Sequence, residues 1–539
     1  MWMPNAASGR LPMKKLLDGI LKLNQRVPVL VIVAWAALYA RRPFVMGLYH
    51  DDWWGFIEAT QGSAPFSLQR LVLFLLGQFP PRPMAGMLAF LTTSISGSSA
   101  FCYQACAAAV VLLAALSLRG FFAGLVDRQC PRRFLAADLG VVFWLSTPWS
   151  IAVNSWVTCA AVQGLPAQVF FTEAGRMILL PDRWTAKRTA ALSALLLASY
   201  LCYEAFYLLI FPVAVFAILS RWPASWDRRQ LSRLGVALVA SQLLAIGFNR
   251  FMSQTDPSSS KTFNAAWLQL YASSLQNLPA TLSGTLAPFS SLWRMLAYLM
   301  AAAALVMLAK ALPEKRLRAG AARLCGIVGR GLSWILLATV TSSLAGYAYT
   351  ADGLTARSLL VATAATAVLF FAAVAALLLL APSRWAAGVL LGAALSIVCL
   401  NAWAQNARLA TWVSVWRIER EVLSRAPLRE IQALPPETRI LYVGPSYDRG
   451  LVVFGADWDI TGAVFSLPPL SSNRKAFENL KMIHATTTMY DWTWDGQTLV
   501  QNCPGYFVHE FPTPSLYVWD YERNRLYPAE KGFRLAASP

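Results

Sequence analysis

The chain alternates between long apolar blocks and short clusters of basic residues. The longer apolar blocks approach 20 residues, about the length that an α-helix needs to cross the ~30 Å hydrocarbon core of a bilayer. Clusters of Lys and Arg between such blocks are typical of cytoplasmic loops. The pattern therefore predicts an α-helical polytopic membrane protein, with its basic N-terminal segment in the cytoplasm.

This alternation predicts eleven membrane spans. The first runs from Val27 to about Leu48 and is kept as one span across Arg41 and Arg42, because long arginine side chains can reach the interface near a helix end. The other expected spans are 99–118, 134–152, 157–175, two short spans within 189–220, 234–252, 289–309, 331–349, 358–381 and 386–404.

The apolar segment 189–220 decides on which side of the membrane the next basic cluster lies. Two short spans that turn near Tyr203 and Glu204 keep both flanking basic clusters in the cytoplasm. The turn would then lie below the outer surface and line a cavity. A single tilted helix, with Arg221 to Arg233 outside, is the alternative. An odd number of spans places the C-terminal tail outside, and the first outer loop covers Tyr49 to about Gly97.

The tail, residues 405–539, has the mixed pattern of a small α/β domain. It begins with an amphipathic helical stretch, Trp412 to Ile431, which Pro435 and Pro436 should end. Strand-like runs follow, and Trp494-Asp495-Gly496 is typical of a hairpin turn. The runs are 440–443, 451–454, 489–494, 498–500 and 516–519. We therefore expect a transmembrane catalytic domain over residues 1–404 and a C-terminal periplasmic domain over residues 405–539.

The amino-acid composition supports the assignment as a membrane protein and excludes other classes of protein. Of the 539 residues, 57% are hydrophobic and only 14% are charged, whereas a soluble domain carries about 25% charged residues. The tail holds 14 basic and 14 acidic residues, so the net charge of +19 resides in the first 404 residues. There it follows the positive-inside pattern rather than forming a nucleic-acid surface. The three His and eight Cys residues show no metal-ligand spacing and no disulfide framework.

Carboxylates gather where the first outer loop begins. The segment Tyr49-His50-Asp51-Asp52-Trp53 is followed by Glu58, which gives three carboxylates within eight residues. A carboxylate at the membrane surface can act as general base towards a hydroxyl group. It can also hold a divalent cation that neutralises a phosphate leaving group. The alternative is an ordinary charged boundary at the end of a span.

This segment resembles the acidic motif of the GT-C class of polytopic glycosyltransferases, which use sugars linked to polyprenyl phosphates. The number of spans, a helical first outer loop, a soluble outer domain and Arg82-Pro83 are similar to members of that class. The resemblance implies that the first-loop acid is the base or, in metal-dependent branches, a ligand of Mg²⁺ or Mn²⁺. Asp52 is favoured for this role, with Asp51 as its partner or orienting group.

The same resemblance implies sites for the donor and the acceptor. Arginine suits a phosphate because its planar guanidinium group donates two parallel hydrogen bonds. The predicted donor phosphate ligands are Arg357, Arg82 and Arg42, and the predicted substrate-cavity residues are Glu204, Glu58, Asp352, His50 and Trp53. For Arg357 and Arg42, an interfacial anchor is the alternative role.

The sequence thus predicts an inverting glycosyltransferase in a bacterial inner membrane. It would move a sugar from a polyprenyl phosphate to a cell-envelope glycan or a lipid-linked acceptor at the outer face. A transporter or lipid flippase is an alternative from another class, for which charged groups within spans and inverted repeats would be expected. A polymerase or ligase of surface glycans, and a structural protein that works through its outer domain, are further alternatives.

Overall fold

The computed structural model describes a mostly helical chain with a small α/β part at its C-terminal end. Contacts divide the chain into two compact units. Unit 1 comprises 1–41, 110–152 and 164–406, and unit 2 comprises 42–109, 153–163 and 407–539. The described residues are 27–49, 52–53, 65–79, 82–125, 133–147, 156–180, 184–203, 206–207, 209–221, 227–255, 367–368, 370–371, 374, 384–435, 437–448, 451–454, 457–468, 470–472, 481–484, 491–494, 497–503 and 507–529.

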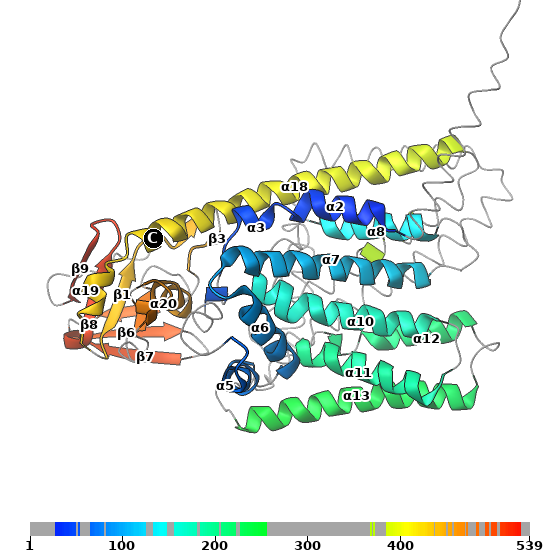
Figure 1. Ribbon diagram of the computed structural model, residues 1–539, viewed down its shortest axis with the longest axis horizontal. Coiled ribbons are helices and arrows are strands. Elements are labelled where there is room, and N and C mark those ends of the chain that lie inside the picture. Colours follow the sequence, from blue (N-terminus) through cyan, green and yellow to red (C-terminus); the bar gives the residue numbers. More distant parts are fainter. Residues whose placement is uncertain are drawn as a thin grey trace, which may run out of the picture. The chain divides into compact units, whose positions relative to one another are not determined.

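Unit 1 is built from packed helices (Figure 1). Helix α10 packs against α11 and α12, α11 also packs against α13, and α2 packs against α8. Two long helices, α7 and α18, run from one unit into the other. The bounds are α2 (Val29–Tyr39), α7 (Ala100–Leu125), α8 (Arg133–Ser146), α10 (Gly164–Leu179), α11 (Ala186–Cys202), α12 (Ile210–Arg221), α13 (Arg228–Thr255) and α18 (Arg384–Ser424).

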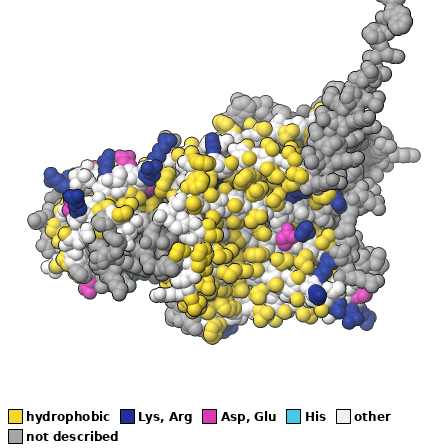
Figure 2. Space-filling view, viewed as in Figure 1, with side chains coloured by type: hydrophobic (Ala, Val, Ile, Leu, Met, Phe, Trp, Pro, Cys, Tyr) yellow, Lys and Arg dark blue, Asp and Glu magenta, His cyan; other side chains and the backbone are white. Residues whose placement is uncertain are grey.

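Among the described residues, two helices are long and apolar enough to cross a membrane, Ala100–Leu125 and Arg228–Met252. They match the expected spans 99–118 and 234–252. Large apolar side chains of α13, such as Val236 and Leu243, are exposed, and hydrophobic side chains cover much of the helical face in view (Figure 2). The full set of eleven spans stays a prediction. Spans 289–309 and 331–349 lie outside the described residues, as does most of 358–381.

The first expected span is not one continuous helix. Helix α2 ends at Tyr39, and a separate short helix, α3 (Arg42–Val45), follows. Pro43 explains the break, because a proline inside a helix has no N–H to donate and its ring clashes with the carbonyl four residues earlier, here Tyr39. The expected first span therefore contains two helices, and that the segment crosses the membrane once stays a prediction.

The segment 189–220 is interrupted as the first of its two interpretations requires. Helix α11 ends at Cys202 with Tyr203 in an extended conformation, and α12 begins only at Ile210. The continuous tilted helix is therefore not formed. On which side of a membrane this break lies stays a prediction, and Glu204 lies outside the described residues.

The last expected span and the tail helix are one element. Helix α18 continues for 41 residues, from Arg384 to Ser424, through the region where a boundary was expected. The prediction that the tail helix extends to Ile431 was wrong, because Pro427 interrupts it and a short helix, α19 (Leu428–Gln432), follows.

Unit 2 joins the described residues of the first loop to the C-terminal part of the chain. In the first loop, α5 (Leu68–Val72) leads into the π-helical segment η1 (Leu73–Gln78), and α6 (Pro83–Ser96) packs on η1. A second π-helical segment, η2 (Thr158–Gln163), also packs on α6. The first loop is therefore helical where it is described, as the resemblance implied.

The C-terminal part carries a four-stranded sheet in the order β4-β1-β8-β9. Strand β1 is parallel to both β4 and β8, whereas β9 is antiparallel to β8. A three-stranded antiparallel sheet, β5-β6-β7, and a short β2-β3 pair complete it. The bounds are β1 (Arg439–Val443), β2 (Tyr447–Asp448), β3 (Leu451–Val452), α20 (Asp457–Phe465), β4 (Lys481–His484), β5 (Asp491–Trp494), β6 (Thr498–Cys503), β7 (Phe507–Pro512), β8 (Leu516–Asp520) and β9 (Arg525–Pro528).

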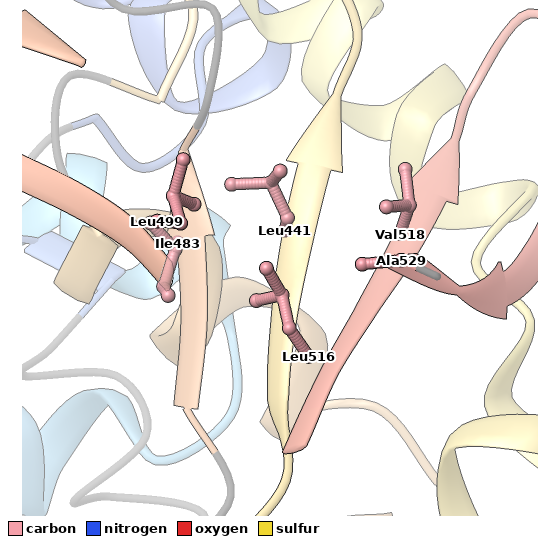
Figure 3. Packing of buried hydrophobic residues seen from close by; sticks show 6 residues of the cluster. All are labelled: Leu441, Ile483, Leu499, Leu516, Val518 and Ala529. Atoms are coloured by element: carbon pink, nitrogen blue, oxygen red, sulfur yellow. The ribbon is translucent and has the colours of Figure 1, made fainter. Parts of the chain in front are cut away.

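Buried aliphatic side chains join the four-stranded and the three-stranded sheet into one core (Figure 3). The strand-like runs of the sequence all coincide at least in part with strands, and β5 pairs with β6 as the predicted hairpin requires. Strands β2, β4, β7 and β9 and helix α20 were not predicted. The labelled core residues are Leu441, Ile483, Leu499, Leu516, Val518 and Ala529.

Candidate functional site

Asp52 lies just beyond α3, and its carboxylate is buried and fully engaged. One oxygen, Oδ1, accepts hydrogen bonds from the backbone N–H of Thr158 (2.7 Å) and from its hydroxyl (2.8 Å). The other, Oδ2, accepts from the backbone N–H groups of Val157 (3.0 Å) and Tyr49 (3.2 Å). A carboxylate offers about four lone-pair positions, and these four donors match them in number.

The local structure explains why an acidic residue occupies position 52. The first N–H groups of a helix have no partner within the helix, and Val157 and Thr158 are the first two residues of the helical segment that contains η2. The carboxylate of Asp52 supplies the missing acceptors and places its negative charge at the positive end of the helix dipole. Asp52 therefore fixes the start of η2 to the first outer loop.

The environment of Asp52 favours its protonated form more than water does. Burial raises its pKa from the ordinary value of 3.8 to about 7, while the hydrogen bonds from Thr158, Val157 and Tyr49 act in the opposite direction. A general base works best when its pKa lies near the operating pH. Asp52 thus has a pKa suited to accepting a proton under neutral conditions.

Arg82 holds the other end of the same π-helical segment. It stands at the N-terminal end of α6, and its Nη1 donates to the side-chain oxygen of Gln163 at 3.3 Å. The two first-loop residues that the sequence singled out, Asp52 and Arg82, therefore both contact residues 157–163. Segments of π-helix occur frequently at functional sites.

The neighbours of Asp52 are tied to the C-terminal half of α18. The Tyr49 hydroxyl donates to the carbonyl oxygen of Trp412 at 2.9 Å, and the two rings meet edge to face. The indole N–H of Trp53 donates to Glu419 at 3.4 Å, and its ring centroid lies 5.8 Å from that of Trp416. Trp53, a predicted cavity residue, is itself buried, and its ring packs against protein side chains.

Glu419 is the residue of this site that the sequence analysis missed. Only 1% of it is exposed, and burial raises its pKa well above the ordinary value, with the nearby charges of Asp459 and Asp52 acting in the same direction. A signal was present in the sequence, because Trp412, Trp416 and Glu419 follow the spacing i, i+4, i+7 of a single helix face.

The other predicted site residues are placed differently. Arg42 is buried, 2% exposed, and its predicted roles stay predictions. Arg41 donates to the side chain of Asn406 at 2.7 Å. The remaining candidates lie outside the described residues, and the structure does not place them. They are His50, Asp51, Glu58, Glu204, Asp352 and Arg357.

Two acids of the helical bundle have basic partners. Asp138 on α8 is fully buried and binds Arg119 of α7 at 2.5 Å. Glu173 on α10 binds Arg176 at 2.6 Å and accepts a hydrogen bond from the Ser117 hydroxyl at 2.9 Å. These contacts account for both charges as structural pairs, whereas a transport path would use such groups to bind a moving ion.

All four lone-pair positions of the Asp52 carboxylate meet N–H and O–H donors, so a divalent cation would bind there only if one of these donors, such as the Thr158 hydroxyl, moved away. Within the part of the chain that the structure describes, no group of three or more His, Cys, Asp or Glu side chains is arranged to hold a metal ion. The predicted partner ligand, Asp51, lies outside that part.

Comparison with known proteins adds no family assignment. No protein-family model matches the chain, and no curated protein matches it. The functional assignment therefore depends on the residues of this chain and on the geometry around Asp52.

Proposed function

We propose that the protein is an inverting integral membrane glycosyltransferase. It would move a sugar from a polyprenyl phosphate to a cell-envelope glycan or lipid-linked acceptor at the outer face of a bacterial inner membrane. Support comes from the acidic motif of the first outer loop, from helices of membrane-spanning length, and from the exposed apolar side chains of α13.

The single observation that carries the proposal is the buried carboxyl of Asp52, with a pKa raised to about 7. Three of its four hydrogen-bond donors are backbone N–H groups, which the fold holds in place. The fourth, the Thr158 hydroxyl, can rotate about its side-chain bond. It is therefore the donor that another hydroxyl can replace.

The chemical step follows from that exchange. The acceptor hydroxyl takes the place of the Thr158 hydroxyl on Oδ1 and gives its proton to the carboxylate. Its oxygen then forms a bond to the anomeric carbon of the donor sugar, while the bond from that carbon to the phosphate oxygen breaks. The attack and departure take place on opposite faces, which inverts the configuration. Arg82 is the described residue proposed to stabilise the charge on the departing phosphate.

The test is sugar transfer in membranes that contain the full chain, supplied with a panel of radiolabelled polyprenyl-phosphate sugars. Asp52→Asn and Asp51→Asn are compared with wild type at equal expression, with Asp227→Asn, an exposed residue at the start of α13, as matched control. Transfer by wild type and the control that is lost in Asp52→Asn supports the proposal. Transfer that persists in both Asp52→Asn and Asp51→Asn contradicts the assigned mechanism.

A further inference from the structure

Glu419 lies at the meeting point of three segments within unit 2. It belongs to α18, and its carboxyl group lies between Trp53 of the first outer loop and Phe454, which follows β3. Trp53 is the direct neighbour of Asp52 in sequence. Glu419 therefore links the acid motif to the C-terminal part of the chain through one side chain.

The contacts use both carboxyl oxygens. Oε2 accepts from the indole N–H of Trp53 at 3.4 Å, and Oε1 accepts from the backbone N–H of Phe454 at 3.5 Å. Both bonds are longer than the usual 2.9–3.0 Å, so their strength as single bonds is modest. Their importance lies in the fact that one buried group receives a donor from each side.

Packing around Trp53 supports the same link. Its ring lies 5.8 Å from that of Trp416 and 6.3 Å from that of Phe454. On α20, Gly462 allows a close approach, because a Cβ atom there would come within 2.8 Å of the Trp53 carbonyl oxygen. Residues of α18, the β3 end and α20 thus enclose Trp53.

A carboxyl group is a costly choice for this position. Burying an acidic side chain costs free energy unless its polar atoms find partners, and here the nearby carboxyls of Asp459 and Asp52 add repulsion to the charged form. An apolar residue would complete the buried face of α18 at lower cost. The carboxyl group of Glu419 has a specific role here, because it accepts from two N–H groups that belong to different segments.

We propose that Glu419 is a positioning residue that couples the acid motif to the C-terminal domain. By accepting from Trp53 and Phe454 together, it fixes the backbone at residues 52–53, and with it the carboxylate of Asp52. The C-terminal domain then controls the geometry of the proposed base. This inference rests on the proposed glycosyltransferase activity for its catalytic consequence, but the coupling itself does not require that activity.

The test compares two variants of similar size in the full chain, reconstituted in lipid nanodiscs. Glu419→Gln keeps one acceptor oxygen and replaces the other with an NH2 donor. Glu419→Met removes both acceptors. The matched control is Glu421→Met on the same helix, where the acid is exposed and pairs with Arg425. Readouts are kcat and KM for sugar transfer, and hydrogen exchange in peptides that cover 49–53 and Phe454.

We expect Glu419→Met to lower kcat between about tenfold and about 100-fold, the scale of small misplacements of catalytic groups. KM for the donor should stay within about twofold, because donor contacts are not altered. Glu419→Gln should give an intermediate kcat, because its amide oxygen can accept from one N–H while its NH2 group faces the other. Exchange at both peptides should rise in Glu419→Met, rise less in Glu419→Gln and stay near wild type in the control.

A second variant, Trp53→Phe, separates coupling from loss of folding, because it keeps an aromatic ring and removes the N–H. Combined with Glu419→Met, it should add no further loss of kcat, since both changes break the same contact. The inference would be overturned by additive losses of kcat in the double variant, or by a Glu419→Gln variant as impaired as Glu419→Met. It would also be overturned if exchange in Glu419→Met rose in only one of the two peptides. If wild type transfers no sugar, the proposed function fails separately, and hydrogen exchange decides the coupling.

Discussion

Asp52 and Thr158 are 106 residues apart in the chain, yet one oxygen of the Asp52 carboxylate accepts both the backbone N–H and the hydroxyl of Thr158. The pair connects the acidic motif of the first outer loop to the beginning of η2. The same carboxylate thus has two roles in our proposal, since it holds a helix end in place and receives the proton of the acceptor.

The hydroxyl of Thr158 provides the first prediction. Thr158→Val keeps the shape of the side chain and removes one donor to Asp52, so we expect a loss of about 1.5–3 kcal/mol in stability, the range for a hydrogen bond to a charged group. The loss should appear as a lower midpoint of thermal unfolding at pH 8. Thr158→Ser, which restores the hydroxyl, should regain most of it. Equal midpoints for the Val and Ser variants would contradict this contact.

The pKa of Asp52 predicts how the transfer rate depends on pH. Only the ionised carboxylate can accept the proton of the acceptor, so the rate should rise with pH and level off above about pH 7. The measurement is kcat/KM for the acceptor between pH 5 and pH 9, with donor binding saturated. A rate that already levels off near pH 4, the ordinary range for an aspartate, would show that Asp52 is not the base.

Protein stability should depend on pH in the opposite direction. Because the folded protein has a raised pKa at Asp52, this carboxyl contributes stability that is fully present below its ordinary pKa of 3.8. That contribution is lost as the pH rises through about 7. We therefore expect the unfolding midpoint to fall between pH 5 and pH 8 in wild type, and to fall less in Asp52→Ala, which does not titrate. A parallel decline in both proteins would argue against a raised pKa.

Arg82 allows donor binding to be separated from structural support. If its guanidinium binds the donor phosphate, Arg82→Lys should raise KM for the donor, because lysine lacks the planar pair of donors. Gln163→Leu removes the acceptor of the Arg82–Gln163 hydrogen bond and should leave this KM within about twofold. Steady-state kinetics with varied donor concentration checks both. The same rise in KM for the two variants would mean that Arg82 acts only by supporting η2.

Much of this architecture follows from local sequence patterns. The apolar block that forms α7 and the strand-like run that forms β1 were predicted, because hydrophobic periodicity is decided within each segment. The break after Tyr39 could have been predicted from Pro43, because its missing N–H prevents a continuous helix. The prediction treated the apolar character of the block as decisive and gave the proline too little weight.

The candidate site was predictable only in part, for a different reason. Adjacent acids after an apolar block drew attention to Asp52, but its partners at Val157 and Thr158 depend on contacts across more than 100 residues. Nothing in the local sequence of either segment specifies that pairing. Glu419 was overlooked because a charged residue on an amphipathic helix is ordinarily on its solvated face, and only tertiary packing reverses that expectation.

The Arg119–Asp138 pair yields a prediction that separates a structural role of the pair from a role in the reaction. Asp138 is fully buried and binds Arg119 at 2.5 Å. Asp138→Asn should destabilise the protein by about 3–5 kcal/mol, because it leaves the arginine charge uncompensated. The double variant Arg119→Met/Asp138→Leu removes both charges, and its stability should return towards wild type.

The double variant also bears on function. If the pair is structural, as its geometry favours, sugar transfer by the folded double variant should stay within about threefold of wild type, a change of less than about 0.7 kcal/mol in the barrier. If the pair instead takes part in the reaction, the double variant should fold and lose transfer. Thermal unfolding and transfer measured on the same nanodisc preparation distinguish the two. Loss of transfer at full stability would show that the pair acts in the reaction and not only in the fold.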